Sequence, residues 1–146
     1  MTYKIVMAML IGFLNMLLLD FFFFLGIKLN YLDALEIKEY YNVLFADNQN
    51  VFIFIIGATV LGFFMVFLRN VKYKASLFLF GWAVSALTLI NPIGYAIGEE
   101  LFMKKNQDIK MVTRSFLGDI MYEGRKELFV RFKGDDTITK VKKGER

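Results

Sequence analysis

The feature that most constrains this chain is a hydrophobic run over residues 5–27, in which Asn15 and Asp20 are the strongly polar side chains. At about 1.5 Å per residue, the run makes a helix of roughly 34 Å, enough to cross a hydrocarbon core of about 30 Å with some tilt. An ionised carboxylate inside such a helix costs about 2.5–3.5 kcal/mol on insertion scales. We therefore predict a membrane-spanning helix, uncleaved, in which Asp20 faces protein or water.

Asn15 and Asp20 are predicted to need separate partners, because five positions place them about 140° apart around a helix. One reading has Asp20 capped by a Ser, Thr or Lys of a neighbouring helix, or reaching the nearer membrane surface. The other has it titrate or pair with a cation during function. The first is favoured, since the other hydrophobic runs contain no companion acid or base.

A second span is predicted over residues 51–68, which carry no charge. Arg69, Lys72 and Lys74 follow at once and place this basic hinge in the cytoplasm by the positive-inside rule. Within the span, Ala58 and Gly62 lie one helical turn apart and would let another backbone approach closely, either in the same subunit or in a partner.

A third hydrophobic segment covers residues 75–98, and we expect it to kink or break near Pro92, because proline removes a backbone donor. Length favours a full crossing, whereas the distribution of Lys and Arg favours a re-entrant turn that would return the tail to the side of the basic hinge. Three spans are the preferred prediction. The segment also contains four small residues proposed for helix packing: Gly81, Ser85, Gly94 and Gly98.

The polar connection over residues 28–50 is predicted to hold a short interfacial helix, because apolar and tyrosine side chains recur there at close to helical spacing. Its last four residues, 47–50, form a plausible helix N-cap cluster before the second span.

After the transmembrane domain of residues 1–98, the composition changes to a small soluble tail over residues 99–146. Beyond a basic connector at Lys104 and Lys105, alternation predicts a three-stranded antiparallel β meander. One strand would place Val112, Phe116, Ile120 and Tyr122 on one face, and the next would do so with Leu128, Val130 and Phe132. The predicted turns fall at residues 124–125 and 133–136. A sheet this small needs a surface to rest on.

The fold class predicted is thus a mainly α membrane protein with three transmembrane helices and a C-terminal antiparallel β meander. The chain has no Cys and no His, and no phosphate-cradling glycine loop, so we expect no enzyme, no cofactor and no metal site. The net charge of +4 is modest, and nucleic-acid binding is not expected.

The leading hypothesis is a non-enzymatic, multi-pass protein of a bacterial-type inner (plasma) membrane, acting as an accessory, assembly or stabilising subunit. Its partners would be membrane lipids and other integral membrane subunits or copies of itself. The alternative is a small oligomeric ion channel or pore-forming effector. The predicted partner-binding residues inside the membrane are Asn15, Asp20, Ala58, Gly62, Gly81, Ser85, Gly94 and Gly98.

Overall fold

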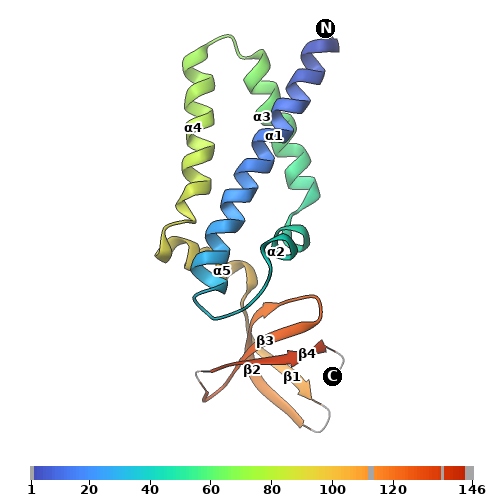
Figure 1. The fold of residues 1–146 in the computed structure, drawn as a ribbon, viewed down its shortest axis with the longest axis vertical. Coiled ribbons are helices and arrows are strands. Elements are labelled where there is room, and N and C mark those ends of the chain that lie inside the picture. Colours follow the sequence, from blue (N-terminus) through green and yellow to red (C-terminus); the bar gives the residue numbers. More distant parts are fainter. Residues whose placement is uncertain (1, 112–113, 136, 144–146) are drawn as a thin grey trace.

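The computed structural model describes residues 2–111, 114–135 and 137–143, and it joins a helical part to a C-terminal sheet (Figure 1). The helices come first: α1 (Thr2–Ile27) with its π-helical extension η1 (Lys28–Leu32), α2 (Tyr41–Asn48), α3 (Val51–Phe67), α4 (Val71–Leu87) and α5 (Asn91–Phe102). The strands follow: β1 (Lys104–Met111), β2 (Arg114–Glu123), β3 (Glu127–Phe132) and β4 (Ile138–Lys142).

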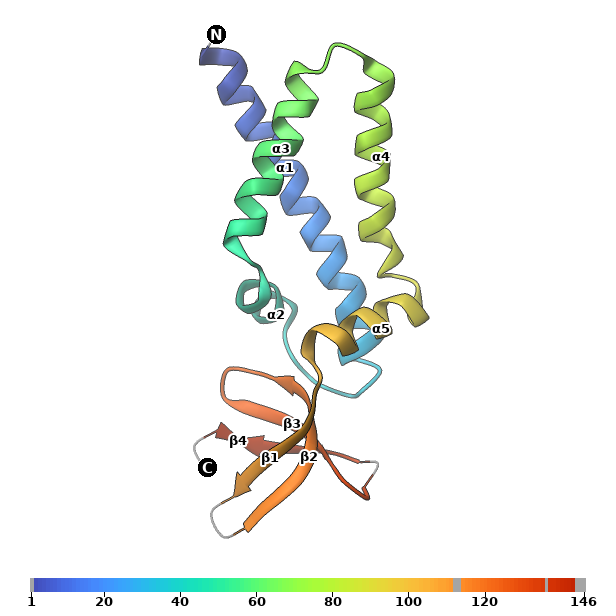
Figure 2. The same cartoon turned by 180° about the vertical axis from the view of Figure 1, so that it is seen from behind.

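Three helices run along the long axis of the molecule (Figures 1 and 2). From the N-terminal end, α1 leads to the sheet, α3 returns, and α4 leads to the sheet again. The shorter helices lie across this direction near the sheet, because α2 and α3 meet at 85° and α4 and α5 at 80°. The predicted N-cap is confirmed at Asn50, whose side chain accepts hydrogen bonds from the backbone N–H groups of Phe52 and Ile53.

The closest helix contact joins α1 to α3 through small residues. A Cβ added to Gly12 would lie 1.9 Å from the Ala58 carbonyl oxygen, and one added to Gly62 would lie 1.9 Å from the Ala8 carbonyl oxygen. The two backbones therefore touch, as small residues at one-turn spacing allow. Ala58 and Gly62 were predicted to pack either in the same subunit or against a partner. In the structure they pack against α1 of the same chain.

The third hydrophobic segment is broken where a break was expected, between α4 and α5. Pro92 stands in the first turn of α5, where its missing N–H costs nothing. The chain does not turn back toward the basic hinge, because α5 packs on η1 and the sheet lies at that same end (Figure 2). The sheet thus lies at the opposite end of the helical part from the basic hinge, whereas the re-entrant alternative would have returned the tail to the hinge side.

The sheet has four antiparallel strands in the order β1-β2-β3-β4, so the three-stranded prediction is wrong. The missed strand is β1, which was taken for a connector. It lies at an edge of the sheet and, of its described side chains, buries only that of Ile109. An edge strand can be this polar because one of its sides faces water. The predicted turn at residues 124–125 is confirmed between β2 and β3.

The predicted faces of the strands are partly correct. Leu128, Val130 and Phe132 do share a face, where they pack with Ile109, Ile120 and Val141. Ile120 and Tyr122 were expected on one face, but a register shift between them turns Tyr122 to the other face. Val112 and Asp136 lie outside the described residues.

The second face of the sheet rests on the helical part. A junction core forms there from the buried side chains of Phe24, Ile27, Tyr31, Leu32, Ile37, Leu44, Met121, Tyr122 and Phe129. The Tyr31 hydroxyl also donates a hydrogen bond to the Met121 carbonyl oxygen at 2.9 Å. The parts on either side of the composition change near residue 98 therefore share this core. The short helix predicted in the polar connection is α2, which begins only at Tyr41.

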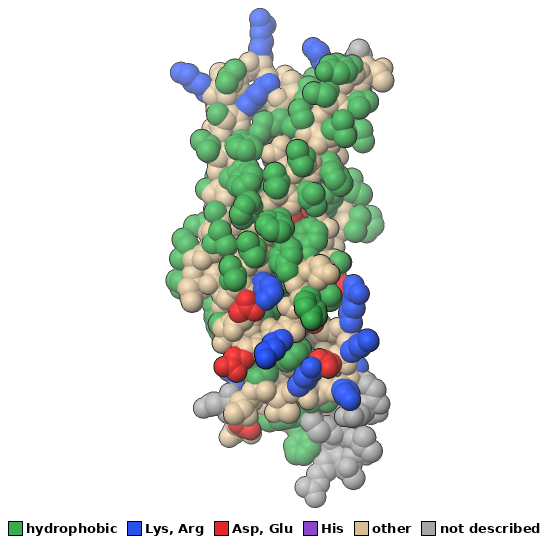
Figure 3. All heavy atoms as spheres, in the orientation of Figure 1, with side chains coloured by type: hydrophobic (Ala, Val, Ile, Leu, Met, Phe, Trp, Pro, Cys, Tyr) green, Lys and Arg blue, Asp and Glu red, His purple; other side chains and the backbone are tan. Residues whose placement is uncertain are grey.

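On the face drawn in Figure 3, the helical part is mostly hydrophobic, and charges gather toward its two ends. Lys and Arg side chains mark the end far from the sheet, whereas both signs occur around the sheet. The helix over Thr2–Leu32 is long and apolar enough to cross a membrane, and the two bent pairs, α2 with α3 and α4 with α5, pass the same test only when each pair is taken together.

Candidate functional site

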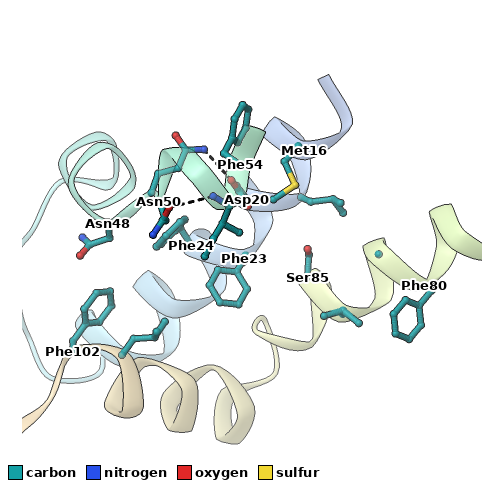
Figure 4. Close-up of a pocket in the computed structure, with 16 residues that line it drawn as sticks. Met16, Asp20, Phe23, Phe24, Asn48, Asn50, Phe54, Phe80, Ser85 and Phe102 are labelled. Carbon is teal, nitrogen blue, oxygen red and sulfur yellow. Dashed lines mark hydrogen bonds between the residues drawn. The ribbon is translucent and has the colours of Figure 1, made fainter. Parts of the chain in front are cut away.

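An open cavity of about 680 Å³ lies between the helices near the sheet, and Asp20 stands in its wall (Figure 4). Most of its lining is apolar, with Met16 and Phe23 from α1, Phe80 from α4 and Phe102 from α5 among the contributors. We call this cavity the Asp20 groove. It exists because α3 and α4 both pack on α1, while few contacts join them to each other.

Asp20 has one polar partner among the described residues. Its Oδ2 accepts a hydrogen bond from the Gln49 side-chain amide at 2.9 Å. Gln49 lies in the short linker between α2 and α3, and the 85° bend there brings its amide to Asp20. The expected cap was a Ser, Thr or Lys, and Gln49 was not identified from the sequence. The sequence signal that could have identified Gln49 is its position just before the second hydrophobic run, where a polar side chain lies close to the neighbouring helices.

No described basic side chain approaches Asp20. Of the seven ion pairs in the described part of the chain, none involves this carboxylate. The pairs lie instead around the sheet and the polar connection. One of them ties α2 to the sheet, where Arg125 Nε donates to Asp47 Oδ2 at 2.7 Å. Hydrogen bonding to Arg125 holds the pKa of the Asp47 carboxyl below its usual value.

Asn15 lies in a different place from Asp20, in keeping with their spacing in sequence. Its side-chain amide donates to the Ile11 carbonyl oxygen one turn back, at 2.8 Å. It lines a cavity of about 10 Å³ that Trp82 also lines. The Trp82 indole N–H is buried there without a hydrogen-bond partner among the described residues.

Two of the predicted small residues lie at the Asp20 groove. Gly81 and Ser85 both line it from α4, and Ser85 is only 7% exposed. An added Cβ on Gly81 would sit at an ordinary 3.4 Å from the Leu19 side chain, so this position is not tightly packed.

The other two small residues of that segment, Gly94 and Gly98, lie away from the groove in the contact between α5 and η1. A Cβ on Gly94 would meet the Thr88 carbonyl oxygen at 2.0 Å, and one on Gly98 would meet Tyr31 at 2.4 Å. Asn30, which the sequence did not single out, donates to the same Thr88 oxygen at 2.8 Å. These glycines therefore allow α5 to pack closely against η1 and the end of α4 in the same chain.

The groove can recognise a ligand through hydrogen bonds or an ion pair with one carboxylate, that of Asp20. In the described part of the chain, no three His, Cys, Asp or Glu side chains gather as a metal-binding set. The groove offers Asp20 and neutral amides or hydroxyls, which can accept and donate hydrogen bonds in an apolar surrounding. Such a site is able to bind a partner that is apolar along its length and carries a hydrogen-bond donor at one point.

Comparison with protein-family models, with curated proteins and with solved structures finds no match. The protein is a mainly helical chain with a C-terminal four-stranded antiparallel sheet, and its N-terminal helix is long and apolar enough to span a membrane.

Proposed function

We propose that this is a membrane protein in which α1, α3 and α4 each cross the bilayer. The helices α3 and α4 have 17 residues each, about 26 Å, near the lower limit for a span, and the first turn of α4 carries the hinge residues Lys72 and Lys74. Their outward faces are apolar, with Phe52 80% and Leu79 65% exposed. The helices α2 and α5 would then lie along one membrane surface, and the sheet would rest on that surface.

The density of basic residues supports one orientation of the three spans. The start of α1, with Lys4, and the turn from α3 into α4, with Arg69, Lys72 and Lys74, lie at the end far from the sheet (Figure 1). Three of these basic residues fall within six positions, so we place this hinge in the cytoplasm and the sheet on the outer side of a bacterial-type inner membrane. The total near-membrane count of Lys and Arg is four at this end and six at the sheet end, which favours the reverse orientation, so labelling decides between the two.

This topology can be tested with single introduced cysteines, because the natural chain has none. In intact cells, Lys133→Cys should react with a membrane-impermeant maleimide, and Arg69→Cys should react only after permeabilisation. Reaction of both in intact cells would contradict the three-span arrangement. The reversed pattern would keep the spans and overturn the orientation.

We further propose that the protein is a non-enzymatic accessory, assembly or stabilising subunit of a larger membrane complex. One observation carries this proposal: the Asp20 carboxylate stands in the wall of an open apolar groove, with a single hydrogen bond from Gln49. In a membrane, leaving a carboxylate and a cavity of this size facing lipid is unfavourable. A partner inserted between α1, α3 and α4 would cover both.

Affinity purification from native membranes after mild crosslinking tests this function. The unaltered protein should co-purify with a defined membrane protein or with further copies of itself, and Asp20→Ala should lose most of that material. The matched control is Thr59→Ala, because Thr59 is a polar residue of α3 that bonds its own helix at 2.8 Å and faces outward. A strict monomer with no companion chain would contradict the proposal.

The channel alternative receives less support. It requires Asn15 and Asp20 to line one lumen, whereas within a single chain they line separate cavities. Purified protein in liposomes should therefore be electrically silent.

A further inference from the structure

The Asp20 groove has one polar position that its own chain leaves incompletely satisfied. A carboxylate has two oxygens that can each accept more than one hydrogen bond. Within the described residues, Asp20 receives the one bond from Gln49. None of the seven described ion pairs reaches it, although basic side chains elsewhere in the chain are paired with acids.

Two other polar side chains of the groove, Asn48 and Asn50, are engaged in their own segments, and the lining contains no second charged side chain. The Asn48 amide donates to the Leu44 carbonyl oxygen at 2.8 Å. The Asn50 carbonyl oxygen caps α3 through the N–H groups of Phe52 and Ile53. Asp20 is therefore the position at which the groove can select an occupant by charge (Figure 4).

Two sources of positive charge can meet Asp20. Its hydrogen-bond donor Gln49 directly follows α2, which lies at the membrane surface in the proposed arrangement, so a lipid ammonium group and a basic side chain of a partner both reach this level. A lysine or arginine on a helix brings an aliphatic stem and an apolar helix face, which can fill the rest of the groove between α1, α3 and α4. The crosslinking experiment below separates the two sources.

We propose that the Asp20 groove binds a transmembrane helix of a partner protein, and that a lysine or arginine of that helix pairs with Asp20. This inference rests on the proposed function and adds the chemistry of the partner. Charge complementarity identifies the occupant: an otherwise apolar groove with one carboxylate fits an apolar helix with one basic residue.

The partner is first identified by photocrosslinking. A photoreactive phenylalanine analogue replaces Phe80, which lines the groove, and the control replaces Phe63, which is 55% exposed and does not line it. Mass spectrometry of the crosslinked peptide from position 80 should give a hydrophobic segment containing Lys or Arg. A lipid adduct, or a helix without a basic residue, would overturn the inference.

Charge reversal then tests the pairing. Asp20→Asn keeps the size of the side chain and should reduce recovery of the partner at least tenfold without lowering the unfolding temperature. Asp20→Lys should abolish recovery, and changing the partner's basic residue to Asp should restore it.

Unchanged recovery with Asp20→Asn would refute the ion pair while leaving an accessory subunit in place. Absence of any protein crosslink, together with a strict monomer, would remove the proposed function itself. The two failures are thus distinguishable.

Discussion

Replacement of Gly62 by alanine tests the contact that joins α1 to α3. The added Cβ would lie 1.9 Å from the Ala8 carbonyl oxygen, so the two atoms must separate by about 1.5 Å to reach an ordinary contact of 3.4 Å. The added Cβ is fixed to the α3 backbone and the oxygen belongs to the α1 backbone, so no side chain can rotate away and the two helices must move apart. Overpacking of this kind costs about 1–3 kcal/mol, against a gain of up to about 1 kcal/mol in helix propensity. We expect a net loss of about 1–2 kcal/mol.

Gly81→Ala is the matched control, because it has the same propensity gain while its Cβ meets Leu19 at 3.4 Å. Thermal unfolding in mild detergent, followed by circular dichroism, separates the two. Each kcal/mol corresponds to about 2–4 °C for a chain of this size. Gly62→Ala should unfold at a lower temperature than the unaltered protein, and Gly81→Ala should not. Equal unfolding temperatures for the two variants would refute the backbone contact between α1 and α3.

Three further predictions concern the ends of the helices and the sheet. Tyr31→Phe removes a buried hydrogen bond to β2 and should cost about 1 kcal/mol, measured as faster hydrogen exchange in β2 without loss of helix content. Asn50→Ala removes the N-cap of α3 and should cost about 1 kcal/mol in thermal unfolding, with Asn42→Ala on the exposed side of α2 as control. Hydrogen bonds from Lys104 and Lys143 lower the pKa of Glu123 from 4.5 to about 2. Because the pKa of Glu123 is lower in the folded protein, its ion pairs stabilise the fold above pH 4.5, and this stabilisation disappears as the pH falls toward 2. It amounts to about 1 kcal/mol of unfolding free energy after solvent screening. Glu123→Gln should abolish this part of the pH dependence of thermal unfolding.

Local sequence was sufficient for α1, for α3 and for the break between α4 and α5. The hydrophobic runs at residues 5–27 and 51–68 correspond closely to α1 and α3, and the break near Pro92 was expected from the chemistry of proline alone. A cap of α3 was predicted within residues 47–50, because capping depends on residues two and three positions away, and Asn50 is the residue that forms it. In each case the cause and its effect lie within one or two helical turns.

The sheet shows where local reasoning failed. Hydrophobic alternation could not identify β1, since an edge strand needs few buried side chains. It also could not foresee the register shift after Ile120, because a bulge depends on how β2 pairs with β3. Both features are decided by a neighbouring strand.

The sequence by itself determined that Asp20 lies within an apolar helix and needs a neighbour, because a charge inside such a run is costly unless it is paired or solvated. Only the tertiary structure decided which neighbour it has. Gln49 is 29 positions away and reaches Asp20 because α2 and α3 meet at 85°. Likewise, the partner of Gly62 is Ala8, from the other end of the helical part of the chain. Such pairings follow from how the helices pack on one another, and residue spacing within one helix carries no information about them.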